Sequence, residues 1–308
     1  MILHHYPTSP FAEKIRLIFG YKHIEWQGVE IPMVMPKPDL MPLTGGYRKT
    51  PVLQIGADIY CDTALICDVI EHSVPTPSLY NAAPKGLVRT VAQWADNLLF
   101  PVAMAYNFQP QGAQHVMAGM PPEVVKVFAE DRKAMRGGGA RMPPADATAM
   151  YKSHLRRLST MLEGQPFLLG DTPCLADFSV YHSVWFTLVK VPVIDHILDA
   201  TPLVRDWAHR MAAWGHGKEH TISAAQALQV AAAAQPAPLS DDVFQDEHGI
   251  PLGSEVTVAA ESFGTEPTAG KLVAATRTRL TLERNDAQVG KLHVHFPRMG
   301  FIMKKVDA

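Results

Sequence analysis

The chain has 308 residues, of which 47% are hydrophobic and 19% are charged, and its formal net charge is −2. This composition supports a packed core and excludes global disorder, and the length predicts two or three domains. A net charge near zero gives no general attraction to nucleic acid or acidic membranes. The three cysteines exclude a disulfide-rich secreted scaffold, and no apolar run approaches the ~20 residues of a membrane helix. The first residues lack the pattern of a signal peptide, so we expect a cytoplasmic protein.

The segment 1–78 alternates strand and helix signals and predicts an α/β domain. A strand-helix-strand unit precedes a hairpin with Gly56 and Ala57 at its turn, and a final helix follows. Ser9 and Pro10 are typical of a helix start. The expected strands cover 2–6, 24–31, 51–55 and 58–61, and the expected helices cover 10–20 and 63–72. This order corresponds to an α/β unit of the size of thioredoxin.

The segment 86–234 carries helical signals throughout and predicts an all-helical domain, separated from the first domain by the proline-rich residues 74–85. Residues 109–121 and 137–144 are predicted to be loops. The expected helices cover 89–105, 123–136, 145–163, 175–190, 202–214 and 223–234.

The segment 241–308 changes character after a second proline-containing linker at 235–238 and predicts a small all-β barrel or sandwich. The expected strands are 256–258, 271–275, 279–283, 292–296 and 301–305. Eight basic side chains in 271–305 are balanced by acidic ones, mostly in 240–270. We therefore expect a structural or dimer-supporting role and no nucleic-acid binding.

Three features of the first domain combine hydroxyl or acidic groups with the start of a strand or helix. Ser9 precedes a helix, where it either caps the backbone or donates a hydrogen bond to a bound thiolate. Thr50-Pro51 enters a strand, and a cis bond there would turn the Thr50 backbone toward a peptide-like ligand. Asp62 and Thr63 lie between a strand and a helix, where they either cap the helix or hold an ammonium and a carboxylate.

These features and a fourth motif resemble the cytosolic glutathione S-transferase superfamily. The run from Ser9 to Leu17 resembles the first-helix signature of its serine and cysteine classes, and Thr50-Pro51-Val52-Leu53 resembles the strand that its cis-proline enters. Asp62-Thr63-Ala64-Leu65 stands where the family usually has Glu-Ser and an apolar pair. Gly170 to Phe178 resembles the helical-domain motif whose Ser/Thr-x-x-Asp caps a buried helix. The resemblance covers about residues 1–230 and implies a thioredoxin-like domain followed by an all-α domain.

The resemblance implies a glutathione site on the α/β domain. Ser9 would hold the glutathione sulfur as a thiolate, with Tyr6 and Thr8 as alternative hydroxyl donors. The backbone at Thr50 and Pro51 would bind the cysteinyl part of glutathione. The other implied ligands are Asp62 and Thr63 for the γ-glutamyl end and Lys49 for the glycyl carboxylate. An acceptor pocket lined by residues 94–108 and a homodimer are implied as well.

The chain departs from the family pattern at three of these positions. Cys174 replaces the Ser or Thr cap, so the capping of that helix depends on Asp177 bonding back to the backbone. Asp62 is one methylene shorter than Glu. Ser9 in place of cysteine excludes mixed-disulfide exchange there, because a hydroxyl cannot exchange with a disulfide. A serine still stabilises the thiolate of bound glutathione and so permits attack on an electrophile.

The other cysteines and the paired histidines are interpreted as structural. Cys61 has apolar strand neighbours and Cys67 lies one helical turn after Thr63, so both are expected in the core. His4-His5 and His293-x-His295 are pairs without a recognisable third ligand in sequence, and we expect no metal site.

The primary functional hypothesis is a glutathione transferase that activates the thiolate for attack on a small electrophile, with glutathione as co-substrate. Conjugation, isomerisation, dehalogenation and ether cleavage all use this thiolate, and the sequence does not separate them. The alternative is a non-catalytic glutathione-binding or scaffold protein that recruits a partner through 241–308.

Overall fold

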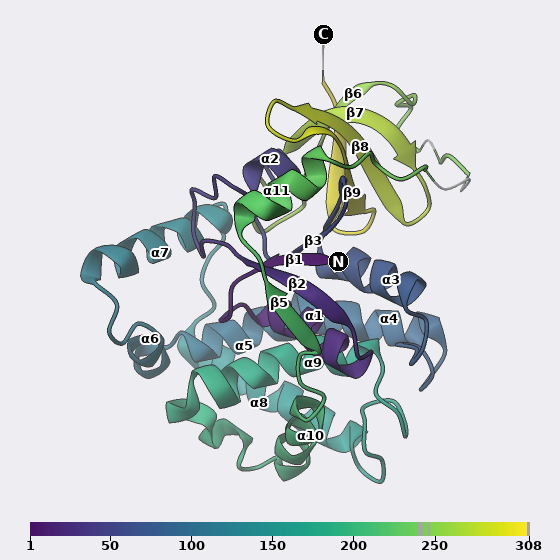
Figure 1. Ribbon diagram of the computed structural model, residues 1–308. Helices are drawn as coiled ribbons and strands as arrows, with labels where there is room; N and C mark the ends of the chain where they lie inside the picture. The colour runs from purple at the N-terminus through teal and green to yellow at the C-terminus, as the bar shows by residue number, and fades with distance from the viewer. Residues whose placement is uncertain (240–242, 246, 307–308) are drawn as a thin grey trace.

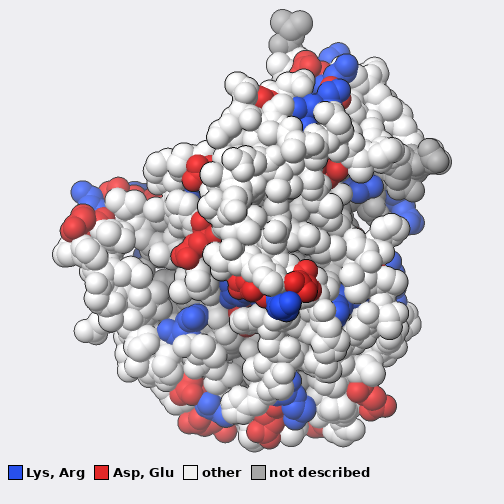
Figure 2. All heavy atoms as spheres, viewed as in Figure 1, with Lys and Arg blue, Asp and Glu red and all other residues white. Residues whose placement is uncertain are grey.

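The computed structural model describes residues 1–239, 243–245 and 247–306. The helical domain lies at one end of the molecule, the α/β domain lies in the middle and the C-terminal strands lie at the other end (Figure 1). None of the described helices combines the length and the apolar character that a membrane span needs. On the face drawn in Figure 2, acidic and basic side chains are interspersed, in keeping with the near-neutral net charge.

The N-terminal domain has the strand and helix order expected of a thioredoxin-like fold. The first strand pairs in parallel with the second and antiparallel with the third, which forms a hairpin with the fourth. A short helix in the proline-rich loop is an addition to the expected elements. The elements are β1 (Ile2–His5), α1 (Pro10–Tyr21), β2 (Glu25–Glu30), α2 (Met41–Thr44), β3 (Val52–Ile55), β4 (Asp58–Cys61) and α3 (Thr63–Ser73).

The helical domain packs around one buried helix, α9 (Leu175–Trp185), in which every residue is buried. The expectation of a plain loop over 109–121 is wrong, because residues 110–116 form a helix that begins at a proline, a residue suited to a first helical turn. The other elements are α4 (Lys85–Trp94), η1 (Ala95–Leu99), α5 (Phe100–Asn107), α6 (Pro110–Val116), α7 (Pro122–Met135), α8 (Pro144–Met161), η2 (Phe186–Lys190), η3 (Pro192–Leu198) and α10 (Pro202–Ala212).

The start of α9 is held by the carboxylate of Asp177. Its Oδ2 accepts hydrogen bonds from the backbone N–H of Cys174 at 3.0 Å and from the Cys174 thiol at 3.3 Å. Its Oδ1 accepts from the backbone N–H of Leu168 at 2.9 Å and from the indole N–H of Trp207 at 3.0 Å. Asp177 therefore ties the helix start to a preceding loop and to α10.

The end of the segment expected to be all-helical returns to the α/β domain. Residues Lys218–Thr221 form a strand, β5, that pairs in parallel with β2. The following helix, α11 (Ala224–Ala232), packs against the sheet and contributes Ala227, Leu228 and Ala231 to the same apolar cluster as the C-terminal strands. The expected helical domain 86–234 is thus interrupted after α10, because β2 presents a free edge to residues 218–221.

The C-terminal strands extend the N-terminal sheet. They are β6 (Glu255–Ala260), β7 (Thr268–Ala275), β8 (Arg279–Asp286), β9 (Gly290–Pro297) and β10 (Phe301–Lys305). The parallel pairing of β9 with β4 gives one ten-stranded sheet in the order β10-β6-β7-β8-β9-β4-β3-β1-β2-β5. The five strands form where the sequence predicts them. They do not form a self-contained barrel or sandwich, because they continue the sheet of the α/β domain from its β4 edge.

The loop between α2 and β3 also contacts the C-terminal strands. The Thr268 hydroxyl donates to the Thr44 carbonyl at 3.0 Å and accepts from the Tyr47 N–H at 3.1 Å. Gly46 has a φ of 157°, and a Cβ there would lie only 2.2 Å from the Pro267 carbonyl oxygen. A glycine is therefore required where these two segments meet.

The two faces of the sheet bury different apolar clusters. Leu3 and Leu53 face α1, α3 and the helical domain, whereas Ile2 and Val52 face α11 and the C-terminal strands. This follows from the two-residue alternation of side chains along a strand. The α/β domain is therefore covered on both faces, and the segments that follow β1, β2 and β4 and the segment that precedes β3 carry the candidate site.

Candidate active site

Ser9 lies between β1 and α1 and is 2% exposed. Its Oγ accepts a hydrogen bond from the backbone N–H of Ala12 at 3.2 Å, so it caps α1. The Ser9 oxygen therefore acts as the helix cap, which is one of the two roles that the sequence suggested. The hydroxyl proton is not used by that bond, and a helix start favours an anionic group in front of it.

The two alternative hydroxyls near Ser9 have different surroundings. The hydroxyl of Tyr6 lies 3.5 Å from Nη2 of Arg132 on α7. Burial raises the pKa of Tyr6, and the Arg132 cation and the Ser9 hydroxyl oppose that rise. Thr8 is exposed, and its hydroxyl lies 3.6 Å from the Met33 sulfur.

Thr50 and Pro51 lie directly before β3, and the peptide bond between them is cis. Nζ of Lys37 donates to the Thr50 hydroxyl at 3.1 Å and to the Arg48 carbonyl at 3.0 Å. Lys37 also lies 5.9 Å from the centre of the Tyr6 ring. Burial, with smaller contributions from Arg132 and Arg48, lowers the pKa of Lys37 to about 8.

Asp62 and Thr63 lie between β4 and α3. Asp62 has a φ of 75°, and its Oδ1 accepts from the Ala64 N–H at 2.9 Å. Thr63 is buried, and its hydroxyl accepts a hydrogen bond from Nζ of Lys14 at 3.3 Å. Asp62 is partly exposed, whereas the Thr63 hydroxyl is already engaged inside the domain.

Lys49 extends between the α/β domain and the C-terminal strands. Its Nζ lies 5.8 Å from the Tyr47 ring centre and 5.2 Å from the Phe301 ring centre. Burial lowers the pKa of Lys49, and the nearby Asp62 opposes this. The C-terminal strands therefore contact Lys49, the residue expected to bind the glycyl carboxylate of glutathione.

Several cations near the site were not identified from the sequence. Arg48 forms ion pairs with Asp131 on α7 and, at 2.7 Å, with Glu266 of the C-terminal region. Arg132 donates to the Met33 carbonyl at 3.2 Å as well as approaching Tyr6. For Arg48, the one signal in the sequence was its position in the proline- and lysine-rich loop before β3. No local signal could place α7 beside it.

An apolar depression lies next to these cations. Met33 and Val34 form one wall, and the other walls come from the first half of α7 and the loop before it, namely Met120, Glu123, Val124, Val127 and Phe128. Its volume is about 240 Å³. It is lined by residues other than the 94–108 segment that the sequence suggested for the acceptor pocket.

Comparison with known proteins places the chain in a family. The family model for the glutathione S-transferase N-terminal domain matches residues 3–78. The crystal structure of a GST-like protein from Pseudomonas syringae is 42% identical, with a TM-score of 0.81, and the match covers 99% of this chain and 98% of that chain. This chain belongs to the glutathione S-transferase superfamily. The resemblance seen in the motifs is thereby confirmed, and the match to the Pseudomonas protein extends over the C-terminal strands.

Two further matches are below 25% identity. The β-etherase LigF from Sphingobium sp. strain SYK-6 is 18% identical with a TM-score of 0.51, over 69% of this chain and 94% of that one. FtsZ-localized protein A from Caulobacter vibrioides is 21% identical over 182 residues, which cover 58% of this chain and 72% of that protein. The match to the etherase shows a similar fold over that part of the chain.

The structure brings the sequence-predicted residues into two groups. Tyr6, Ser9 and Thr50 lie near Lys37 and Arg132, while Asp62 and Lys49 lie together beside the C-terminal strands. Thr8 lies apart at the surface. Cys61 and Cys67 are buried, free thiols, as the core interpretation requires.

Proposed function

We propose that this superfamily member is a glutathione-dependent transferase in which Ser9 donates a hydrogen bond to the thiolate of bound glutathione. The observation that carries the proposal is the grouping of the Arg132 guanidinium, the Lys37 ammonium and the Ser9 hydroxyl around Tyr6. Cations and hydrogen-bond donors stabilise a thiolate relative to a thiol and so lower the thiol pKa.

Ser9 is proposed to act through its hydroxyl proton. Its oxygen accepts from the Ala12 N–H, and its O–H group, which lies beside the Tyr6 hydroxyl, is proposed to turn toward a sulfur in front of α1. The thiol proton leaves to solvent, and the sulfur lone pair forms a C–S bond with the electrophilic carbon. The leaving group, where the electrophile has one, departs with the displaced electron pair.

The remaining parts of glutathione are proposed to follow the domain edge. The Thr50 backbone pairs with the cysteinyl part, and Asp62 binds the γ-glutamyl ammonium through its partly exposed carboxylate. The start of α3 at Thr63 favours the γ-glutamyl carboxylate. Lys49 is proposed to bind the glycyl carboxylate.

The electrophile is proposed to be apolar. The depression between Met33 and Phe128 offers hydrophobic walls beside Arg132 and Tyr6. Conjugation is the most general reaction that this arrangement supports. Isomerisation, dehalogenation and ether cleavage would use the same thiolate.

The organisation of the chain is proposed along the same lines. We assign 1–78 to glutathione binding, 86–234 mainly to the helical domain and 241–308 to the β extension. We propose a homodimer, as the family resemblance implies, and a cytoplasmic location. The β extension supports the site through its contacts with Arg48 and Lys49.

A non-catalytic role is the second candidate. The Ser9 oxygen is already used as a helix cap, and one relative is named for its localisation with FtsZ. In that case the protein would bind glutathione without turning over an electrophile, and the β extension would recruit a partner.

Calorimetric titration of glutathione into the full chain is the first test. We expect saturable binding in the micromolar to millimolar range that Asp62→Asn weakens. Absence of binding contradicts both candidates. Binding without turnover across a panel of aryl halides, epoxides and activated alkenes favours the second.

The role of Ser9 is tested by the ultraviolet absorbance of the bound thiolate against pH. We expect Ser9→Ala to raise the thiol pKa while Thr8→Val, the matched control at the exposed hydroxyl, leaves it unchanged. An unchanged pKa in Ser9→Ala, with a shift in Tyr6→Phe, would assign the donor to Tyr6 instead.

A further inference from the structure

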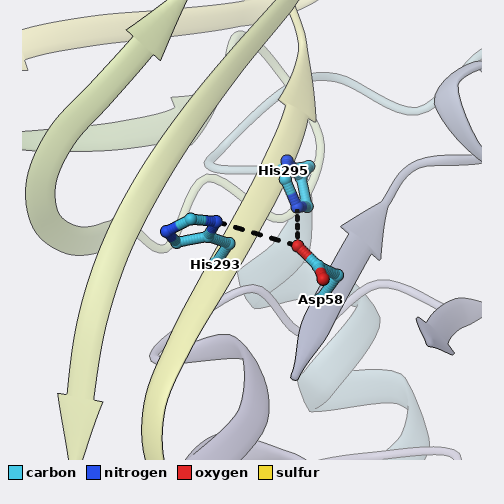
Figure 3. A group of neighbouring side chains, drawn as sticks. All are labelled: Asp58, His293 and His295. Atoms are coloured by element: carbon cyan, nitrogen blue, oxygen red, sulfur yellow. Dashed lines mark hydrogen bonds and ion pairs between the residues drawn. The ribbon is translucent and has the colours of Figure 1, made fainter. Parts of the chain in front are cut away.

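Two strands that are far apart in sequence bring Asp58, His293 and His295 together. In the parallel pairing of β4 with β9, Asp58 lies opposite His293 and Tyr60 lies opposite His295. Residues two apart on a strand share a face, so both imidazoles lie on the same side of β9. Figure 3 shows both rings directed toward the Asp58 carboxylate.

The three side chains present one ligand atom each within a small volume. Nε2 of His295 lies 2.8 Å from Oδ1 of Asp58, and Nδ1 of His293 lies 3.8 Å from the same oxygen. All three atoms lie within 4.8 Å of one another. Metal–ligand bonds of about 2.0–2.2 Å place two ligands of one tetrahedral ion about 3.4 Å apart. The observed spacings bracket that value.

His293 has a buried nitrogen to which the described part of the chain supplies no hydrogen bond. The residue is 7% exposed, and its Nδ1 is buried without a hydrogen-bond partner. Such a nitrogen costs free energy unless something binds it. Its direction toward Asp58 indicates a cation between the two groups.

Asp58 is a buried carboxylate whose ion pairs within the described residues are with histidines. It is 5% exposed, and within the part of the chain that the structure describes no lysine or arginine forms an ion pair with it. A buried carboxylate requires a compensating charge or hydrogen bonds. Its Oδ2 accepts one hydrogen bond, from the Ala237 N–H at 2.8 Å, which leaves Oδ1 for the two histidines.

The surroundings hold the ligands in place. Nδ1 of His295 lies 3.0 Å from the Thr281 hydroxyl, which orients Nε2 toward Asp58. The Tyr60 ring stacks on the His295 ring with centroids 4.5 Å apart. Partners of this kind around a histidine ligand fix its orientation and tautomer.

We propose that Asp58, His293 and His295 bind one divalent transition-metal ion of the zinc type, which joins the C-terminal strands to the α/β domain. Two imidazoles and a carboxylate are a ligand set suited to Zn²⁺ and to neighbouring first-row ions. The site bridges β4 and β9, the contact through which the ten-stranded sheet is continuous. Its role is structural, and it is independent of the proposed glutathione chemistry.

The test uses the full chain after removal of metals with a chelator. Zn²⁺ is titrated by calorimetry, and Co²⁺ by its visible absorption. We expect one equivalent of each, a higher unfolding temperature with Zn²⁺, and at least tenfold weaker binding in His293→Gln. His209→Gln, at an exposed helical histidine, is the matched control and should bind as the wild type does.

Two further measurements guard against a variant that fails to fold. Asp58→Asn keeps the shape of the side chain while removing its charge, and it should also weaken binding. In the wild type, bound Co²⁺ should shift the proton resonances of two histidine rings. The proposal is overturned if the chelated wild type takes up no metal, in which case Asp58, His295 and Thr281 form only a hydrogen-bonded chain. It is equally overturned if both ligand variants bind as tightly as the wild type.

Discussion

Nζ of Lys14 on α1 lies 2.7 Å from Oδ2 of Asp96 in η1, so a buried ion pair joins the α/β domain to the helical domain. The side chain of Lys14 is 1% exposed and that of Asp96 is 15% exposed. Lys14 also donates to Thr63, and Asp96 also contacts Nε2 of His182 on α9 at 3.0 Å. The pair therefore connects the start of α3 with the central buried helix.

Removing one member of this pair should destabilise the protein strongly. Asp96→Asn leaves the Lys14 ammonium buried without its counter-charge, and we expect a loss of about 3–5 kcal/mol. Urea unfolding followed by circular dichroism measures this. Lys126→Met, which breaks an exposed pair with Glu130, should change stability by less than about 0.5 kcal/mol. Equal effects of the two substitutions would contradict the structural role of the buried pair.

The same pair predicts a loss of stability in acid. Burial alone would raise the pKa of Asp96, but Lys14 and His182 outweigh burial and hold it below its usual value. A carboxyl whose pKa is lowered in the folded state stabilises the protein above its unfolded pKa, and this stabilisation is lost as pH falls through the folded value. The free energy of unfolding should therefore fall less between pH 5 and pH 3 in Asp96→Asn than in the wild type. An identical pH dependence would refute this assignment.

The three cysteines should be inert in the folded protein. All are buried, and burial raises the pKa of Cys67 and of Cys174 to about 12 and that of Cys61 well above its usual value. Since the thiolate is the reactive form, a thiol reagent such as Ellman's reagent should modify none of them near pH 8. After unfolding in denaturant, all three should react. Rapid modification of the folded protein would mean that a cysteine has access to solvent.

Lys37 should make ligand binding depend on pH. Its pKa is lowered to about 8 and it contacts Thr50, so raising the pH through 8 removes a cation beside the proposed glutathione site. The affinity for S-methylglutathione, which has no thiol to titrate, should fall between pH 7 and pH 9. In Lys37→Gln we expect weaker binding at pH 7 and a smaller dependence on pH.

The control for Lys37 is Lys133→Gln, at an exposed position of α7. Lys133→Gln should bind S-methylglutathione with the pH dependence of the wild type. Titration of the ligand's own amine affects all variants equally, so only the difference between the two variants reports on Lys37. If Lys37→Gln keeps the full pH dependence, Lys37 does not interact with the bound ligand.

Much of the local structure was predictable because it depends on short-range patterns. Ser9 and Pro10 indicate the start of α1, and alternation around Val52 and Ile59 indicates the β3–β4 hairpin. The function of the same residues was harder to predict. Ser9 has one hydroxyl, and the sequence alone left open whether it caps α1, as its oxygen does, or also serves a bound thiolate.

The histidines of β9 illustrate what was missed. His293 and His295 were correctly placed on one strand face, but Asp58, the third ligand of the proposed metal site, lies in a different domain of the sequence. Lys37 and Arg132 are a similar case, because the approach of α7 to the loop before β3 leaves no mark in either segment.

The sequence by itself determined the elements, their order and the superfamily motifs, since periodicity, caps and turns act over a few residues. Only the tertiary structure decided that β9 pairs with β4, that β5 returns to β2, and that Arg132 reaches Tyr6. Strand edges offer the same backbone groups to any partner, so the choice of partner depends on the packing of the whole chain.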